Sequence, residues 1–143
     1  MNKMLVPIII GSKSDEIFAN MVSTNLKEYG IESEIRVASA HKSIHHLLEI
    51  VSNYEGNKNV HVYITIAGRS NALSAVIDAN SIRPVIAYPI YSSTYGGADI
   101  FSSLRVCTSF FSCTKEIWVA ASSSFVVFFF ILMPVYFVFL PNK

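Results

Sequence analysis

The sequence predicts an α/β fold built on a parallel sheet. Short apolar runs rich in β-branched residues alternate with longer segments whose apolar residues recur at helical spacing. An order of strand, helix, strand, helix implies parallel pairing with right-handed crossovers. The length of 143 residues suits one domain with a sizeable core.

Four strands and four helices are expected in alternation. The first strand, 5–10, is nearly all apolar, as in a strand covered on both faces, although Pro7 is a mild objection. A helix over 15–29 follows, and Gly30 supplies its stop. The other predicted strands are 34–38, 60–66 and 84–88, and the other predicted helices are 43–54, 71–80 with Ser70 as its cap, and 97–104.

The charge balance excludes an overall field that would attract nucleic acid. Eleven Lys and Arg residues stand against ten Asp and Glu, a formal net charge of +1. A small anionic substrate would therefore need local donors. Cys107 and Cys113 have five residues between them, which matches neither a redox pair nor a zinc pair. The start of the chain does not open a secretory signal, so we expect a cytoplasmic protein.

The first predicted strand ends in a small polar loop. Amide groups at the start of the following helix favour an anion such as phosphate, and Gly11 lets the backbone come close. Ser12 and Ser14 add hydroxyl donors, while the Asp15 carboxylate suits sugar hydroxyls. The same residues could merely cap the helix. The loop is neither a Walker loop nor a dinucleotide fingerprint.

The second predicted strand ends in Ser39-Ala40-His41-Lys42. His41 is the only histidine directly after a strand, and imidazole moves protons well near neutral pH. Lys42 could hold an anion or tune that imidazole. Alternatively, His41 is a solvent-facing residue at a helix start, or it binds a metal together with His45, although no third ligand is evident. We expect the other two histidines to be ordinary surface or strand-edge residues.

The third predicted strand ends in Gly68-Arg69-Ser70-Asn71. The Arg69 guanidinium is a fork of donors suited to a carboxylate or phosphate, and Ser70 with Asn71 could orient a small polar reactant. Ser-Asn is also a common helix start. Because open α/β sheets bind ligands at the carboxyl ends of their strands, three such loops in succession indicate an enzyme site.

Four motifs together resemble the phosphoribosylaminoimidazole (AIR) carboxylase family of purine biosynthesis. The chain is most similar to the animal-type branch, in which the domain is commonly fused behind a SAICAR synthetase domain. The bacterial mutase branch usually has Arg after the histidine and a third loop rich in glycine and alanine. The resemblance therefore favours direct use of CO2 over the carboxyamino-AIR mutase reaction. The motifs stand in the family's order and spacing: Gly11-Ser12-x-Ser14-Asp15, Ser39-Ala40-His41-Lys42, Ala67-Gly68-Arg69-Ser70-Asn71 and Ser102-Ser103-Leu104-Arg105.

The resemblance implies a flavodoxin-like three-layer sandwich that assembles into octamers and carboxylates AIR without ATP, biotin or metal. No cofactor is expected, and the implied ligands are AIR and CO2. By resemblance His41 carries the proton and Lys42 assists it. The implied substrate-binding residues hold the ribose phosphate (Ser12, Asp15 and Ser39), position CO2 or the new carboxylate (Ser70 with Arg69 and Asn71), or complete the loops (Gly11, Ser14 and Gly68).

The resemblance ends near Arg105, so we expect an incomplete carboxylase domain over 1–105 and a non-matching hydrophobic tail over 106–143. The uncharged stretch 119–140 is long enough to span a bilayer, which leaves a membrane anchor as one interpretation. We favour translated intron or frame-altered sequence, because Val106-Cys107 can be encoded by GTATGT, which looks like a splice donor. A core truncated in this way predicts weak or absent activity and poor solubility. Two further alternatives are an inactive membrane-tethered paralogue and a nucleotide-binding module.

Overall fold

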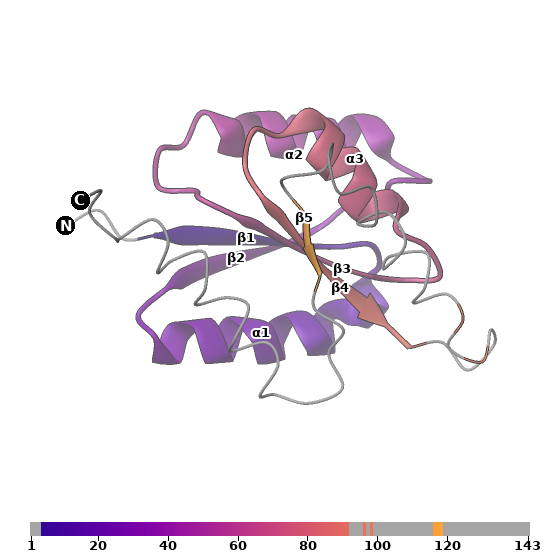
Figure 1. The fold of residues 1–143 in the computed structure, drawn as a ribbon, viewed down its shortest axis with the longest axis horizontal. Helices are drawn as coiled ribbons and strands as arrows, with labels where there is room; N and C mark the ends of the chain where they lie inside the picture. Colours follow the sequence, from indigo (N-terminus) through magenta and orange to yellow (C-terminus); the bar gives the residue numbers. More distant parts are fainter. Residues whose placement is uncertain (1–3, 92–95, 97, 99–115, 119–143) are drawn as a thin grey trace, which may run out of the picture.

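The computed structural model describes residues 4–91, 96, 98 and 116–118, and these form a parallel sheet with helices on both faces (Figure 1). The strand order is β2-β1-β3-β4-β5, and every neighbouring pair is parallel. This order is that of flavodoxin-like folds, so the expected α/β class is confirmed. The strands are β1 (Leu5–Ile10), β2 (Glu32–Val37), β3 (Tyr63–Gly68), β4 (Val85–Ile90) and β5 (Glu116–Trp118), and the helices are η1 (Lys13–Asp15), α1 (Glu16–Glu28), α2 (Ile44–Glu55) and α3 (Ala72–Asn80).

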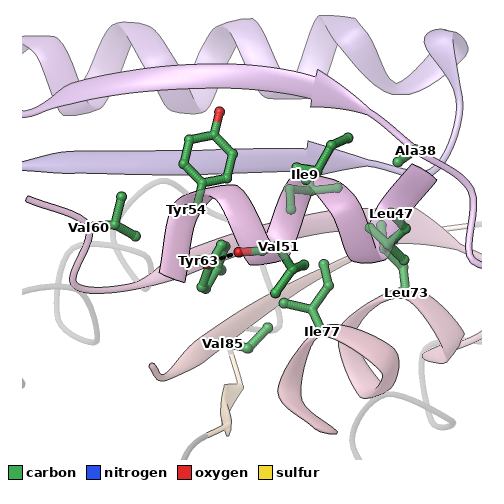
Figure 2. Close-up of a cluster of buried hydrophobic side chains, with 11 residues drawn as sticks. Ile9, Ala38, Leu47, Val51, Tyr54, Val60, Tyr63, Leu73, Ile77 and Val85 are labelled. Atoms are coloured by element: carbon green, nitrogen blue, oxygen red, sulfur yellow. Dashed lines mark hydrogen bonds between the residues drawn. The ribbon is translucent and has the colours of Figure 1, made fainter. Parts of the chain in front are cut away.

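The sheet separates two apolar clusters, which makes three layers (Figure 1). On one face Ile8 and Ile10 of β1 pack with α1. On the other face Ile9 packs with α2 and α3 around Tyr63, as Figure 2 shows. All three isoleucines are fully buried, so β1 is covered on both faces as its apolar run predicts.

The expected strand 60–66 is wrong at both ends, and Pro7 supplies a physical reason for its start. Val60 forms only an isolated bridge to Leu5, and the continuous ladder begins at Ile8 with Ile64. Two residues of β1 therefore face three residues of the neighbouring chain, as in a β-bulge. Pro7 lies in this gap, where its missing N–H breaks no ladder hydrogen bond.

The stop of the first helix is confirmed at Gly30. The Gly30 N–H donates to the Lys27 carbonyl at 3.0 Å, and the Ile31 N–H donates to the Leu26 carbonyl at 3.0 Å. This pair of bonds is the Schellman motif, which places its glycine in the left-handed region. The φ of Gly30 is +72°.

The other predicted elements shift by small amounts or fall outside the described residues. The second strand begins at Glu32, two residues before the prediction, and α1 begins at Glu16 after the short 3-10 turn η1. Sequence reasoning missed β5, because three residues are too few to form a pattern. The predicted helix 97–104 lies almost entirely outside the described residues, as do the two cysteines and 119–140. Within the described part, no helix is long and apolar enough to cross a membrane.

Candidate active site

The three predicted loops emerge side by side at the carboxyl edge of the sheet. The Ala38 N–H donates to the Ile10 carbonyl, and the Gly11 N–H donates to the Ile66 carbonyl, both at 3.0 Å. Strand β1 lies between β2 and β3. The chain passes from β1 to β2 on one side of it and then crosses over to form β3 on the other side, so the strand order reverses at β1. Such a switch point is where open α/β sheets bind ligands.

Gly11 brings the first loop close to the third. A Cβ built on Gly11 would lie 3.4 Å from the Ala67 Cβ and 3.9 Å from Leu73 Cδ2. A larger side chain would push these loops apart. A single Cβ at this position would make ordinary van der Waals contact with the third loop.

The first loop forms a closed turn around Ser12. The Ser14 N–H donates to Ser12 Oγ at 3.3 Å, the Asp15 N–H donates to the Ser12 carbonyl at 3.0 Å, and the Glu16 N–H donates to the Lys13 carbonyl. The helix-start amides of these residues are thus already bonded. Ser14 Oγ donates to Ser12 Oγ at 2.9 Å and lies 3.2 Å from Asp15 Oδ1.

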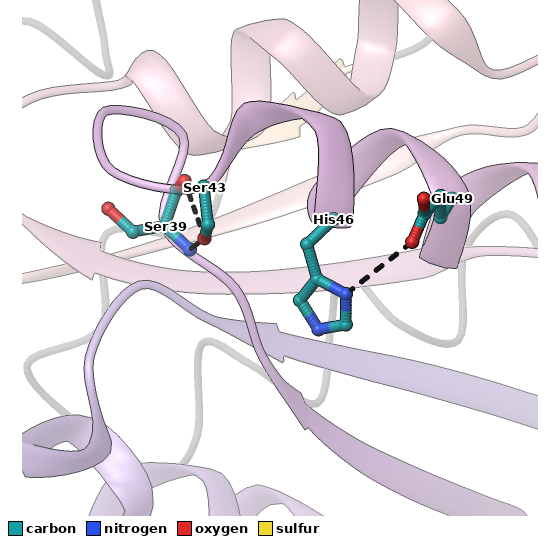
Figure 3. A network of polar contacts seen from close by, with 4 residues as sticks. All are labelled: Ser39, Ser43, His46 and Glu49. Atoms are coloured by element: carbon teal, nitrogen blue, oxygen red, sulfur yellow. Dashed lines mark hydrogen bonds and ion pairs between the residues drawn. The ribbon is translucent and has the colours of Figure 1, made fainter.

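Contacts between Ser39 and Ser43 hold the second loop (Figure 3). The Ser39 N–H donates to Ser43 Oγ at 3.2 Å, Ser43 Oγ donates to the Ser39 carbonyl at 3.3 Å, and the Lys42 N–H donates to Ser39 Oγ at 3.3 Å. The side chains of His41 and Lys42 are exposed within this closed loop. Sequence reasoning missed Ser43, which holds the N-cap position of α2 while its hydroxyl bonds to Ser39.

The remaining histidines behave as surface residues. His46 Nδ1 lies 3.8 Å from Glu49 Oε2 on the exposed side of α2, which Figure 3 also shows. His45 and His61 are exposed. Within the described ranges, no three His, Cys, Asp or Glu side chains gather as a metal-ligand group.

The third loop contains a tight turn centred on Arg69. Its φ is +70°, and the Ser70 N–H donates to the Gly68 carbonyl at 2.9 Å. A bond between residues two apart closes a γ-turn. The Arg69 side chain is exposed, whereas Ser70 and Asn71 are half-buried. The Ala72 N–H donates to Ser70 Oγ at 3.4 Å, so Ser70 helps to start α3 although Asn71 holds the cap position.

Ser70 and Asn71 line a small pocket between the ends of β3 and β4 and the start of α3. It has room for about one water molecule. Its inner wall carries two buried hydroxyls: Thr65 Oγ1 donates to the Ile86 carbonyl at 3.3 Å, and Ser74 Oγ donates to the Asn71 carbonyl at 3.0 Å. Sequence reasoning missed both, because a threonine inside a strand and a serine inside a helix carry no distinctive signal.

Glu55 and Tyr63, whose pKa values are shifted, lie at the opposite, amino edge of the sheet. Burial alone raises the pKa of the Glu55 carboxyl, but hydrogen bonds from Ser81, Tyr63 and the Ile82 amide, with the charge of Arg83, hold it below its usual value. Burial and the bond to Glu55 raise the pKa of Tyr63. Ser81 Oγ lies 2.6 Å and Tyr63 Oη 2.9 Å from Glu55 Oε1. This cluster links α2 to the starts of β3 and β4.

A profile of the AIR carboxylase family matches residues 5–127. The chain belongs to the AIR carboxylase family. Among curated members, the phosphoribosylaminoimidazole carboxylase of Archaeoglobus fulgidus is 50% identical over 103 residues, covering 72% of this chain and 56% of that protein. The human bifunctional phosphoribosylaminoimidazole carboxylase/phosphoribosylaminoimidazole succinocarboxamide synthetase is 38% identical over 101 residues, covering 71% of this chain and 24% of that protein.

Solved members of the AIR carboxylase family share the fold. The crystal structure of Treponema denticola PurE matches with a TM-score of 0.73 and 43% identity, covering 82% of this chain and 72% of that one. The curated Treponema denticola phosphoribosylaminoimidazole carboxylase is 46% identical over 102 residues, 71% of this chain and 64% of that protein. The chain thus spans 56% and 64% of the length of these archaeal and Treponema relatives. The family profile runs past Arg105, and the division of the chain there stays a prediction.

Proposed function

We propose that this chain carboxylates AIR with CO2 to give 4-carboxy-AIR, in de novo purine biosynthesis. The observation that carries the proposal is the meeting of three polar loops at the switch point of the sheet. The names of the related carboxylases agree with this reaction.

The chemistry needs a proton carrier and no ATP, biotin or metal. The enamine-like C4 of AIR attacks the carbon of CO2, a C–C bond forms, and one CO2 oxygen takes the displaced electron pair. C4 then still carries its hydrogen, and a base must remove this proton to restore the aromatic ring. His41 is the proposed base, because it is exposed in a loop fixed by Ser39 and Ser43. Lys42 assists at the same edge.

The remaining residues divide between the two ends of the substrate. Ser12, Asp15 and Ser39 are proposed to hold the ribose phosphate, with Gly11 and Ser14 completing the loop. Since Ser39 Oγ accepts the Lys42 N–H, its own proton can be donated to a ligand oxygen. Ser70, with Arg69 and Asn71 after Gly68, positions CO2 or the new carboxylate. The pocket beside them has room for about one water molecule, so the ring of AIR would lie outside it.

Direct use of CO2 is preferred over the mutase reaction because of two local sequences. Lys42 follows the histidine where the mutase branch usually has Arg, and Arg69-Ser70-Asn71 replaces its glycine- and alanine-rich loop. We further propose a cytoplasmic homo-oligomer. The exposed Ile17 and Met21, one turn apart on α1, are suited to contact a second copy. Size-exclusion chromatography with light scattering tests the assembly.

The test is carboxylation of AIR by the full chain of 143 residues. We expect labelled CO2 to appear in 4-carboxy-AIR in a reaction that needs no ATP and depends on His41. Weak turnover is sufficient, because each comparison is a ratio between variants. Turnover of N5-carboxyamino-AIR in place of AIR with CO2 would show the mutase reaction instead. Binding of 4-carboxy-AIR with no turnover of either substrate would identify an inactive nucleotide-binding paralogue.

A further inference from the structure

The turn at Arg69 places a bulky residue in a costly backbone conformation. Arg69 has the one positive φ among the non-glycine residues that the structure describes. In the left-handed region a Cβ comes too close to the following carbonyl oxygen. Such a conformation persists only where the surroundings impose it, and it is common at ligand sites.

The surroundings of Arg69 impose the turn from both sides. Before it, β3 ends tightly against β4, since a Cβ on Gly68 would lie 3.3 Å from the Ile90 carbonyl oxygen. After it, the Ser70 hydroxyl and the Asn71 carbonyl are engaged in the first turn of α3. Only residues 69–71 lie between the strand and the helix. A γ-turn is the tightest way to change direction within so short a connection.

We propose that residue 69 is a positioning residue whose left-handed backbone, rather than its guanidinium group, holds Ser70 and Asn71 against the pocket. This role rests on the proposed function, since that function assigns Ser70 and Asn71 to CO2 or the new carboxylate. The expectation from sequence was that the Arg69 guanidinium binds the ligand. The pocket wall contains Ser70, Asn71, Thr65 and Ser74, and Arg69 is not among its described lining residues.

Gly30 supplies an internal calibration for this proposal. Its φ of +72° is nearly that of Arg69, and a Cβ built on it meets nothing within 4 Å. Gly30→Ala therefore measures the cost of a Cβ at this backbone angle alone. At position 69 the matched pair is Arg69→Gly and Arg69→Ala, which both lack the guanidinium and differ by one Cβ.

The first measurement is thermal unfolding of the full chain. We expect Arg69→Gly to melt about 3–8 °C above Arg69→Ala, and the unmodified chain to melt above Gly30→Ala by a similar interval. In an ordinary loop conformation the order at position 69 would reverse, because glycine loses more entropy on folding. The proposal would be overturned if the melting temperatures of Arg69→Gly and Arg69→Ala were equal or in reverse order while Gly30→Ala melted below the unmodified chain as expected.

The second measurement follows Ser70 and the chemistry. Exchange of the Ser70 amide hydrogen should be at least about tenfold slower in Arg69→Gly than in Arg69→Val, because a β-branched residue resists this φ. In kcat/KM for CO2, Arg69→Gly should exceed Arg69→Val by about tenfold and equal or exceed Arg69→Lys. Equal losses in Gly and Val, with Lys above both, would assign the role to the cationic side chain and overturn the proposal.

These readouts separate the positioning role from the proposed function. A full chain that shows the melting difference and the exchange pattern but turns over no substrate would reject carboxylation and leave residue 69 as the support of Ser70. A full chain that carboxylates AIR but shows no melting difference between Arg69→Gly and Arg69→Ala would support the function and reject the positioning role of residue 69.

Discussion

At the amino edge of the sheet the Glu55 carboxylate accepts three hydrogen bonds from other segments, whereas at the carboxyl edge the side chains of His41 and Lys42 stand exposed in a loop that is bonded mainly to itself. The first arrangement joins elements that are distant in sequence. The second keeps its side-chain contacts inside each loop and leaves reactive groups open to a ligand. The lowered pKa of Glu55 and the raised pKa of Tyr63 follow from the first arrangement, which is a structural cluster.

This difference separates two kinds of change. A substitution among the exposed groups of the carboxyl edge should alter the reaction with little effect on unfolding. A substitution in the Glu55 cluster should alter unfolding and leave the chemistry of the surviving folded protein intact. Each edge thus serves as the control for the other.

The largest effect is expected for His41→Asn. Loss of the proton carrier should lower kcat for AIR carboxylation by about 10²–10⁴-fold, the usual contribution of general acid-base catalysis. Because the side chain is exposed, the melting temperature should change by less than about 2 °C. The measurements are initial rates at saturating AIR and a thermal melt of the same sample.

His45→Asn is the matched control for His41. His45 is also exposed and lies one helical turn along the chain, in α2. It should keep its rate within about threefold, since the substitution leaves the loop contacts of Ser39 and Ser43 in place. Equal losses in the two variants would remove His41 from the proton step.

The next effect is expected for Glu55→Ala at the amino edge. The substitution leaves the Tyr63 hydroxyl, the Ser81 hydroxyl and the Ile82 amide without their shared acceptor. Hydrogen bonds to a charged group are worth about 1.5–3 kcal/mol each when buried, and partial exposure reduces this, so a total loss of about 1–3 kcal/mol is expected. Urea unfolding measures it.

Glu49→Ala controls for the loss of one negative charge from α2. The Glu49 carboxylate is exposed and lies 3.8 Å from the His46 ring, so its removal should cost less than about 0.5 kcal/mol. Equal costs at positions 49 and 55 would mean that the cluster at the amino edge does not stabilise the fold.

The pH dependence of unfolding should also show the stabilisation by Glu55, as a smaller effect. The folded pKa of Glu55 is lowered from its usual value of 4.5, so its stabilisation is complete above that value and is lost as the pH falls through the lower folded pKa. Urea midpoints between about pH 6 and about pH 3 should therefore fall less steeply in Glu55→Gln than in the unmodified chain. Parallel curves would contradict the lowered pKa.

The fold was predictable where a local rule acts by itself. Gly30 ends α1 because the Schellman motif needs a left-handed residue, and the sequence displays that requirement directly. The start of β3 was not predictable, because it depends on which residue lies opposite Pro7 in a neighbouring strand. Such register information is non-local.

The candidate site was predictable as a set of loops but not in its internal contacts. Parallel strand order alone places the loops of His41 and Ser70 on one edge. The bonded amides of the first loop, the γ-turn at Arg69 and the buried hydroxyl of Ser74 depend on the exact path of the backbone. Composition does not encode that path.

The smallest effect is expected for Ser43→Ala. The substitution removes the hydroxyl that accepts the Ser39 N–H and donates to the Ser39 carbonyl, both at the edge of the loop that carries His41. Hydrogen bonds of a half-buried hydroxyl are worth about 0.5–1 kcal/mol, so urea unfolding should show a loss of that size. Ser52→Ala, an exposed position inside α2, is the control and should be nearly neutral.

Because the loop stays attached through the bond from the Lys42 N–H to Ser39 Oγ, the rate of Ser43→Ala should fall less than that of His41→Asn, by no more than about tenfold. A rate loss as large as that of His41→Asn would show that the position of the imidazole depends on this one hydroxyl.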